Sequence, residues 1–392
     1  MIQKNKNVGL AMKHGAKNFL LFLLAAFVFA LPLSAADTIK AEITASNGMV
    51  ASAQPLASAA GLEILMAGGN AVDAAIASAF ALGVVEPNAT GLGGEGMMVI
   101  YLAENKTTIA IDYRSMAPLA DMSKIKFCSE GHVAVAVPGT VAGLCTALKD
   151  YGTKSLAEVM APAIRYARNG FIVSETLAQT IADRFDPISR NEPLLQILAP
   201  EGLPLQTGDI FKNPDLAVTL EKIAAGGPDV FYKGEIAEAI AKDMAKNGGF
   251  ITKADLAAYR AIKREPVRGT YRGYEIVSAP PPVGGISVIE MLNMLECFDL
   301  GSEQPLSPRN VHIMSEVMKR GFADNSAYVG DPDFTQIPAK GLLDKEYARS
   351  RAQEIDLNKI TTSIKAGTPN EHPSTTHLSV LDRHGNMVAL TQ

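Results

Sequence analysis

The chain has 392 residues, of which 47% are hydrophobic, 20% charged and 6% aromatic, and its formal net charge is −5. This composition is typical of a folded globular protein and excludes an intrinsically disordered chain. The small negative charge and the lack of a strongly basic segment argue against nucleic acid as a partner. The length allows one large domain or two smaller ones with a sizeable core.

The N-terminal segment has the features of a secretory signal peptide. Lysines precede an apolar run from Phe19 to Leu31, and small residues follow at positions 34–36. This pattern predicts cleavage near Ala35 or Ala36, so residues 1–36 are the expected signal and the protein is expected in a periplasm or outside the cell. A single-span anchor is the alternative, but the run is shorter than the ~20 residues that a span needs.

Two helices are predicted next. The first runs from Pro55 to Met66 and is stopped by Gly68 and Gly69, and the second runs from Ala71 to Val85 behind the capping residue Asn70. The second helix is apolar almost all round, which is typical of a helix buried on every side. We therefore expect it at the centre of the core.

A β-hairpin is predicted from strands at Met97–Leu102 and Thr107–Tyr113. Alternation along the second strand puts Asp112 and Arg114 on one face. An arginine fork suits the bidentate binding of a carboxylate. From position alone, however, a surface arginine or one paired with an aspartate is the favoured interpretation of Arg114.

The middle of the chain is predicted to be mainly helical. Helices are expected after the capping residues Ser155 and Asn213, from Gly234 to Asn247, and after Ser307. Strands are expected within Arg268–Ala279, with a turn near Arg272 and Gly273.

The last segments differ from the rest. Residues 358–374 are polar, contain Gly and Pro, and have no period, so they predict a mobile linker. Two strands, His377–Asp382 and Met387–Gln392, follow around a polar turn. A two-stranded ribbon is marginally stable alone, so we expect another segment to pack on it.

The loop Gly91–Gly96 fits the spacing GxGxxG. A dinucleotide site needs a strand before this pattern and a helix after it, and here the order is reversed. We therefore predict a loop whose backbone lies close to another backbone or to a ligand. The sequence has no GxSxG elbow, no HExxH helix and no GxxxxGK loop, so no metal or cofactor is expected.

Three cysteines, Cys128, Cys145 and Cys297, allow at most one disulfide, and free or buried thiols are the favoured prediction. Their spacing does not suggest zinc. The segment Asp331–Asp333 is expected to form a capped turn rather than a calcium loop, and His377 is expected to be structural.

The ordered motifs of the chain resemble those of the gamma-glutamyltransferase family, from about residue 40 to the last residue. The motifs that carry the resemblance are Gly48–Ala51, Pro55–Ser58, Gly68–Ala75, Gly91–Gly96, Asp112–Arg114 with Met116–Pro118, Val137–Gly143, Leu256–Tyr259, Pro280–Gly285, Phe322–Asp324, Gly330–Phe334, Thr375–His377 and Gly385–Asn386.

The resemblance implies an α+β fold, the αββα four-layer sandwich of N-terminal-nucleophile hydrolases. This chain would supply the helix-rich large subunit, with a globular region at 37–357 and a terminal hairpin at 375–392. In the family, a precursor cuts itself before a threonine, and Gln392 would be the last residue before that cut. The partner would be the small subunit of the same precursor.

The family's activity implies that the freed threonine attacks the gamma-glutamyl amide of glutathione or a related compound, with its own α-amine as the base. The glutamyl group then passes to water or to an acceptor amino acid or peptide. In this chain the resemblance assigns only Arg114 to the site, as the group that binds the substrate's α-carboxylate. No catalytic residue, metal or cofactor is expected within it.

Two positions depart from the family pattern. Glu95 stands in a loop that is usually glycine throughout, and Pro282–Gly285 stands where a longer run containing serine is common. Either difference is expected to affect activity or specificity. The alternatives to a glutathione-cleaving enzyme are a related acylase, a polyglutamate-processing enzyme, and a truncated remnant that only binds or scaffolds.

Overall fold

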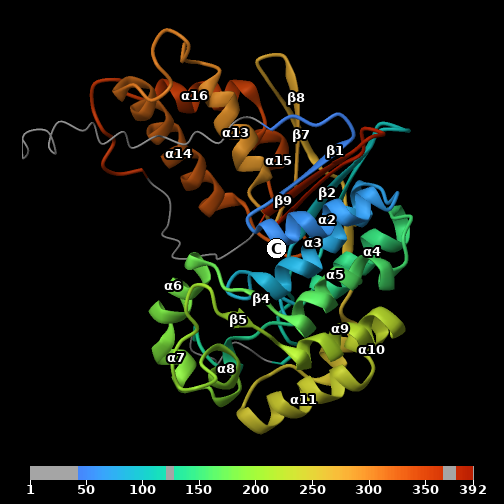
Figure 1. Ribbon diagram of the computed structural model, residues 1–392. Helices are drawn as coiled ribbons and strands as arrows, with labels where there is room; N and C mark the ends of the chain where they lie inside the picture. The colour runs from blue at the N-terminus through green and yellow to red at the C-terminus, as the bar shows by residue number, and fades with distance from the viewer. Residues whose placement is uncertain (1–42, 121–127, 365–376, 392) are drawn as a thin grey trace, which may run out of the picture. The chain divides into compact units, whose positions relative to one another are not determined.

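The computed structural model describes residues 43–120, 128–364 and 377–391, with only the backbone for 377–380 and 391 (Figure 1). The predicted signal peptide lies outside these residues. Among them, a six-stranded antiparallel sheet has the order β1-β9-β10-β2-β3-β6. Its strands are Gly48–Ser52 (β1), Met97–Leu102 (β2), Thr107–Asp112 (β3), Ile262–Arg264 (β6), His377–Asp382 (β9) and Met387–Thr391 (β10).

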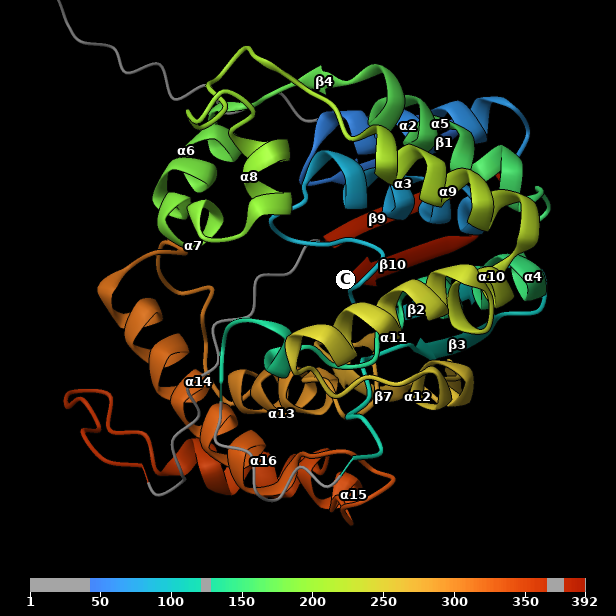
Figure 2. The same ribbon diagram turned by 90° about the horizontal axis from the view of Figure 1, so that it is seen from below.

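The C-terminal hairpin lies in the middle of this sheet. β9 pairs with β1, and β10 lies beside β2 (Figure 2). In the register of β10 with β2, Thr391 faces Met97. The element expected to pack on the hairpin is therefore supplied by earlier parts of the same chain. Strands far apart in sequence surround it, and helix α3 packs across both of its strands.

Helix α3, Ala71–Val85, is the buried helix that the sequence predicts. Every residue in it except Gly83 is buried. Asn70 and Asp73 form the reciprocal capping box at its start, with Asn70 Oδ1 accepting from Asp73 N at 3.0 Å. Asp73 also accepts hydrogen bonds from Thr153 and from the backbone N–H of Lys154, so this buried carboxylate is fully satisfied.

The turn between β9 and β10 is tied to the start of α3. Asp382 Oδ2 accepts from Ala71 N at 3.1 Å and from Asn386 Nδ2 at 2.7 Å. Asn386 Oδ1 in turn accepts from Ala103 N in the β2–β3 turn at 3.1 Å. Asn386 of the Gly385–Asn386 motif therefore ties the central hairpin to the neighbouring β2–β3 turn.

The predicted helices of the middle region are present, together with short ones that carried no clear sequence signal. The remaining helices are Pro55–Met66 (α2), Thr140–Tyr151 (α4), Leu156–Asn169 (α5), Glu175–Asp183 (α6), Phe185–Ser189 (α7), Glu192–Leu198 (α8), Pro214–Gly226 (α9), Pro228–Tyr232 (α10), Glu235–Asn247 (α11), Lys253–Ala258 (α12), Gly285–Leu295 (α13), Pro308–Tyr328 (α14), Ala339–Leu342 (α15) and Lys345–Gln353 (α16), with a 3-10 turn at His132–Ala134. Two small antiparallel sheets pair Phe171–Ile172 (β4) with Ile210–Phe211 (β5), and Val267–Tyr271 (β7) with Tyr274–Ser278 (β8).

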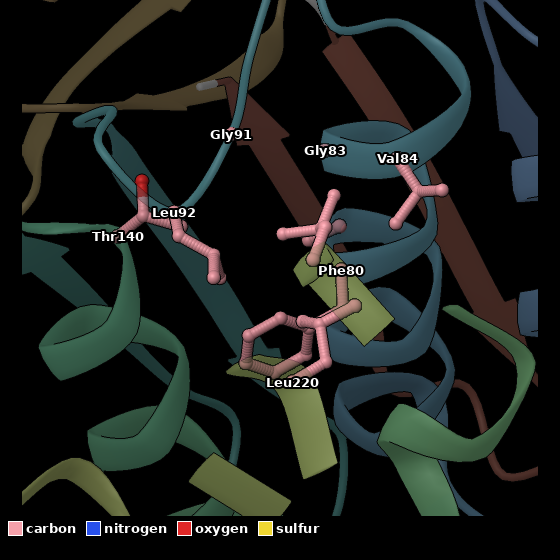
Figure 3. A pocket seen from close by; sticks show the side chains of 9 residues that line it. Phe80, Gly83, Val84, Gly91, Leu92, Thr140 and Leu220 are labelled. Carbon is pink, nitrogen blue, oxygen red and sulfur yellow. The ribbon is translucent and has the colours of Figure 1, made fainter. Parts of the chain in front are cut away.

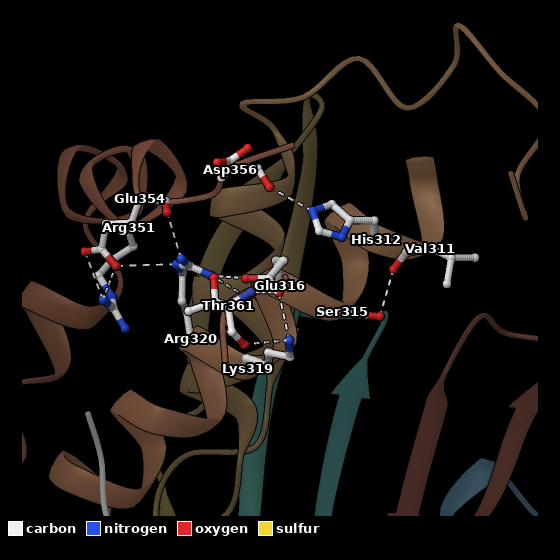
Figure 4. A network of polar contacts seen from close by, with 10 residues as sticks. All are labelled: Val311, His312, Ser315, Glu316, Lys319, Arg320, Arg351, Glu354, Asp356 and Thr361. Carbon is white, nitrogen blue, oxygen red and sulfur yellow. Dashed lines mark hydrogen bonds and ion pairs between the residues drawn. The ribbon is translucent and has the colours of Figure 1, made fainter. Parts of the chain in front are cut away.

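Helices α13, α14 and α16 enclose a second, smaller core centred on Met294, Ile313 and Val317. A polar network borders it (Figure 4). The buried Glu316 accepts from Arg320 Nη1 at 2.9 Å, from Lys319 Nζ at 2.7 Å and from Thr361 N at 3.1 Å. The start of the predicted linker is thus hydrogen-bonded to α14. Residues 365–374 of that linker lie outside the described residues, so its mobility stays a prediction.

Glu290 on α13 is expected to make the stability of the protein depend on pH. Its side chain is fully buried, and burial, followed by the neighbouring Asp324 carboxylate, raises the pKa of Glu290 to about 9. The folded protein therefore keeps a proton that the unfolded chain releases above its ordinary pKa of 4.5. Stability is greatest below that value and falls as the pH rises toward 9.

We expect Glu290→Gln to remove the slope of unfolding free energy against pH, because the amide keeps the shape of the acid but cannot ionise. Wild-type protein should lose up to about 1.4 kcal/mol of unfolding free energy per pH unit across neutral pH. Urea unfolding curves on either side of neutrality measure the difference. Glu104→Gln, in the exposed β2–β3 turn, is the control and should keep the wild-type slope. Equal slopes in wild type and Glu290→Gln would show that Glu290 is not the group responsible.

Candidate functional site

Arg114 follows directly after β3, and its backbone is held on several sides. Tyr113 and Gly96 exchange two backbone hydrogen bonds of 3.0 and 3.3 Å, which extends the β2–β3 pairing by one residue. Arg114 N donates to Asp112 Oδ1 at 3.0 Å, and the Tyr259 hydroxyl donates to Arg114 O at 2.7 Å. Burial raises the pKa of Tyr259, so this hydroxyl stays protonated. The side chain of Arg114 is 42% exposed.

The loop Gly91–Gly96 makes the close backbone approach that the sequence predicts. Gly94 O accepts from Gly139 N at 2.9 Å and from Thr140 N at 3.1 Å. Helix α3 precedes the loop and strand β2 follows it, so the order of elements is the reverse of a dinucleotide site, as predicted. A Cβ on Gly83 of α3 would lie 3.2 Å from Gly91 Cα, which shows how closely the loop rests on the helix.

A small cavity lies beneath this loop, between α3, α4 and α9. Leu92 and Thr140 line one side of it, and Phe80 and Val84 line the other (Figure 3). The lining is apolar apart from Thr140, whose Oγ1 is buried and has no hydrogen-bond partner among the described residues. Its volume of about 10 Å³ leaves room for no more than a water molecule, so the cavity is a packing feature of the core behind the loop.

The motif Val137–Gly143 supports the arginine from behind. A Cβ on Gly139 would lie 1.8 Å from Tyr113 O, and a Cβ on Gly143 would lie 2.1 Å from Cγ of the Tyr113 ring. Both positions therefore need glycine so that the start of α4 can lie against the backbone and ring of Tyr113. Tyr232 completes the support: its hydroxyl donates to Pro138 O at 2.8 Å and its ring stacks on Tyr259.

Glu95 is the acidic partner of Arg114. Arg114 Nη2 lies 3.2 Å from Glu95 Oε1, and Ser115 donates both its backbone N–H and its hydroxyl to Glu95 Oε2. Both residues stand out in the sequence, Arg114 by its motif and Glu95 by its departure from the family pattern, but nothing in the sequence pairs them.

The ion pair of Arg114 is made with Glu95, whereas the nearby Asp112 carboxylate is bound by another arginine. Asp112 binds Arg264 Nε at 2.7 Å, and Arg264 also reaches Asp333 at 3.1 Å. The Asp331–Asp333 turn is thereby fastened to the edge of the sheet. Within it, Asp331 Oδ1 accepts from Asp333 N at 2.9 Å, which is the capped turn predicted.

Strand register places Arg114 near the end of β10. Thr391 faces Met97, and Met97 faces Asp112, so the three residues form one row across the sheet. Because β10 runs antiparallel to β2, its last described residue points toward the Gly96 end of β2. Arg114 stands at the same end of the sheet, two strands away, which is about 10 Å at ordinary strand spacing. Gln392 itself lies outside the described residues.

The cysteines, potential metal ligands and apolar helices do not add to this site. Cys128, Cys145 and Cys297 are free thiols, and burial raises the pKa of Cys145 to about 12. No cluster of three or more His, Cys, Asp or Glu side chains that could hold a metal occurs in the described ranges. Among the helices described, none is long and apolar enough to cross a membrane. The side chain of His377 lies outside the described part of the chain.

The α+β fold of the chain is that of the N-terminal-nucleophile hydrolases, a class shared by solved structures similar to this chain. Residues 57–392 match the model of the gamma-glutamyltranspeptidase family. The chain belongs to that family. The family resemblance and the fold class predicted from the sequence are thereby confirmed.

Three relatives illustrate the match. The chain is 46% identical to the glutathione hydrolase proenzyme of Escherichia coli over 89% of its own length and 63% of the relative's. It is 42% identical to an acylase ACY 1 proenzyme of a Pseudomonas species, over 90% and 66%. It superposes on Helicobacter pylori gamma-glutamyltranspeptidase with a TM-score of 0.79 at 40% identity, covering 84% of this chain and 98% of that one. The chain thus spans less than two thirds of the length of the Escherichia coli relative.

Proposed function

We propose that this chain is the large subunit of an enzyme that cleaves the gamma-glutamyl amide of glutathione and related compounds. The glutamyl group passes to water or to an amino acid or peptide. The observation that carries the proposal is Arg114, an exposed guanidinium on a rigid backbone, at the end of the sheet toward which β10 runs. The relationship to a glutathione hydrolase proenzyme supports the choice of substrate.

The nucleophile in this proposal is a threonine that directly follows Gln392 in the precursor. Self-cleavage of that peptide bond frees the threonine's α-amine, which takes the proton from its hydroxyl as the oxygen attacks the amide carbon. The amine returns the proton to the leaving group, and a threonine ester of the glutamyl group remains. The proenzyme names of the relatives and the course of β10 support this assignment.

Arg114 is proposed to bind the α-carboxylate of the glutamyl group. Within the described residues its guanidinium has one charged partner, through Nη2. Its other N–H groups can therefore donate hydrogen bonds to a ligand. A glutamyl group and an extended arginine side chain together span the gap of two strands to the proposed threonine. Arg114 therefore orients the donor, and the chemistry takes place on the partner subunit.

The proposed partner is the small subunit of the same precursor. Helix α14 presents an exposed apolar stripe of Val311, Met314, Met318 and Phe322, which are 42–56% exposed. Such a stripe is typical of a protein interface. In the same proposal, residues 1–36 direct export, 37–357 form the subunit body, 358–374 are the linker, and 375–392 lead to the cleavage point.

Met318→Lys is expected to weaken the association of the two subunits, since it places a charge in the middle of the apolar stripe. We expect about a tenfold loss of affinity, measured by concentration-dependent dissociation of the mature heterodimer on a sizing column. Leu203→Lys, at a residue that is 72% exposed outside the stripe, is the matched control. Equal dissociation of the two variants would remove α14 from the interface.

The acylase relative supports a second candidate, a related acylase. A donor panel on the complete enzyme separates the two: gamma-glutamyl, glutaryl and polyglutamyl amides of the same amine. The proposal predicts fastest turnover of the gamma-glutamyl amide, and fastest turnover of either other donor would replace it. A non-catalytic remnant is tested by the coding sequence after Gln392, because a stop codon there contradicts the proposed precursor.

A further inference from the structure

The carboxylate of Glu95 is a fixed part of the Arg114 site. Ser115 N donates to Glu95 Oε2 at 2.6 Å and the Ser115 hydroxyl donates to the same oxygen, while Oε1 lies 3.2 Å from Arg114 Nη2. The backbone on which both partners stand is itself pinned by the hydrogen bonds between Gly96 and Tyr113. The carboxylate is thus oriented before any ligand arrives, although its side chain is 37% exposed.

The Arg114 guanidinium, which can donate further hydrogen bonds, thus lies next to Glu95 Oε1, which can accept one. Only Nη2 of the Arg114 guanidinium meets a charged partner among the described residues, and Glu95 Oε1 has no other partner there. The two charges cancel, whereas glycine at position 95 would leave the arginine's charge unopposed. A ligand that carries a carboxylate and an ammonium on one carbon can satisfy both groups at once. A ligand with the carboxylate alone meets the negative charge of Glu95 without compensation.

We infer that Glu95 is a specificity-determining residue that makes the Arg114 site select zwitterionic α-amino-acid donors over donors with a carboxylate alone. The inference rests on the proposed role of Arg114 as the carboxylate-binding group. It gives the carboxylate at position 95 a function of its own: gamma-glutamyl amides, with a free α-ammonium, are accepted, and glutaryl amides of otherwise equal shape are disfavoured.

The exposure of the Glu95 and Arg114 side chains determines the expected size of this discrimination between donors. Both side chains are more than a third exposed, so water and salt screen the charge of Glu95. Exposed charge pairs contribute modestly, which corresponds to about fivefold in an equilibrium constant. The discrimination should therefore shrink as ionic strength rises.

The test uses the complete enzyme with its small subunit. Glu95→Gln keeps the shape and removes the charge. We expect it to lower the ratio of kcat/KM for a gamma-glutamyl amide to that for the matching glutaryl amide by about fivefold, mainly through KM, and to abolish the salt dependence of the ratio. Glu104→Gln, which makes the same change in net charge in the β2–β3 turn at the other end of the sheet, should leave both unchanged.

A second variant, at Ser115, shows whether a change in the ratio comes from a folding defect caused by the substitution at position 95. Ser115→Ala keeps the carboxylate but removes one of the hydrogen bonds that fix it, so it should lower the ratio part of the way. An unchanged ratio in both variants, with wild-type melting temperatures, overturns the inference.

Arg114→Ala shows whether a negative result concerns Glu95 alone or also the proposed role of Arg114. If it raises KM for both donors while Glu95→Gln leaves their ratio unchanged, the role of Glu95 fails and that of Arg114 stands. If it leaves both KM values unchanged, the proposed function of Arg114 fails and the inference fails with it.

Discussion

Arg114→Ala in the complete enzyme is expected to raise KM for gamma-glutamyl donors by about a hundredfold, while folding and self-cleavage persist. Two charge-assisted hydrogen bonds from one guanidinium to a carboxylate contribute about 3 kcal/mol or more, which corresponds to that factor. The fold survives because the side chain is 42% exposed and its one ion pair is also exposed. The backbone at this position is held by groups that the substitution leaves in place.

Steady-state kinetics with a gamma-glutamyl amide measure the change in KM. Arg114→Lys tests whether the charge alone is sufficient. Lysine keeps the charge but loses the bidentate geometry, so its KM should lie between those of wild type and alanine. Arg268→Ala is the matched control, because Arg268 is 46% exposed and pairs with an exposed glutamate on the remote β7–β8 hairpin. Donor KM values in Arg114→Ala within twofold of the Arg268→Ala control would remove Arg114 from the donor site.

The parts of the fold that were predictable are those with local causes. Asn70 and Asp73 mark the start of α3 by capping, and its all-apolar composition predicts burial, both of which the structure shows. The turn at Arg272 and Gly273 is another local signal: Gly273 has φ 87° there, a conformation that favours glycine. Such features are encoded within a few residues, so the sequence alone suffices to find them.

The parts that were not predictable depend on partners far away in the chain. Nothing local to β9 or β10 shows that β1 and β2 flank them, because strand order is set by the packing of the whole sheet. The pairing of Arg114 with Glu95 has the same origin. The two residues are brought together because β2 and β3 are adjacent, and Asp112, the nearer acid in sequence, is bound by Arg264 instead. The family resemblance points to the arginine but not to the carboxylate that pairs with it.

Gly139→Ala is expected to disable the site without touching any charged group. The new methyl group would lie 1.8 Å from Tyr113 O and 2.2 Å from the Tyr259 hydroxyl oxygen, well inside contact distance. Tyr113 O already accepts from Gly96 N, and Tyr259 already donates to Arg114 O, so neither can move without breaking a hydrogen bond. We expect a loss of about 3 kcal/mol or more in unfolding free energy, and a displaced Arg114 in whatever protein still folds.

Gly93→Ala is the matched control for this substitution. Gly93 belongs to the neighbouring glycine-rich loop, yet a Cβ there would meet nothing within 4 Å and its φ is not in the left-handed region. Its stability should stay within about 1 kcal/mol of wild type, since alanine mainly reduces the freedom of the unfolded chain. Urea unfolding of the two variants gives the comparison. Equal stabilities would mean that α4 can withdraw from β3, and that the glycine at 139 is not what holds the arginine's backbone in place.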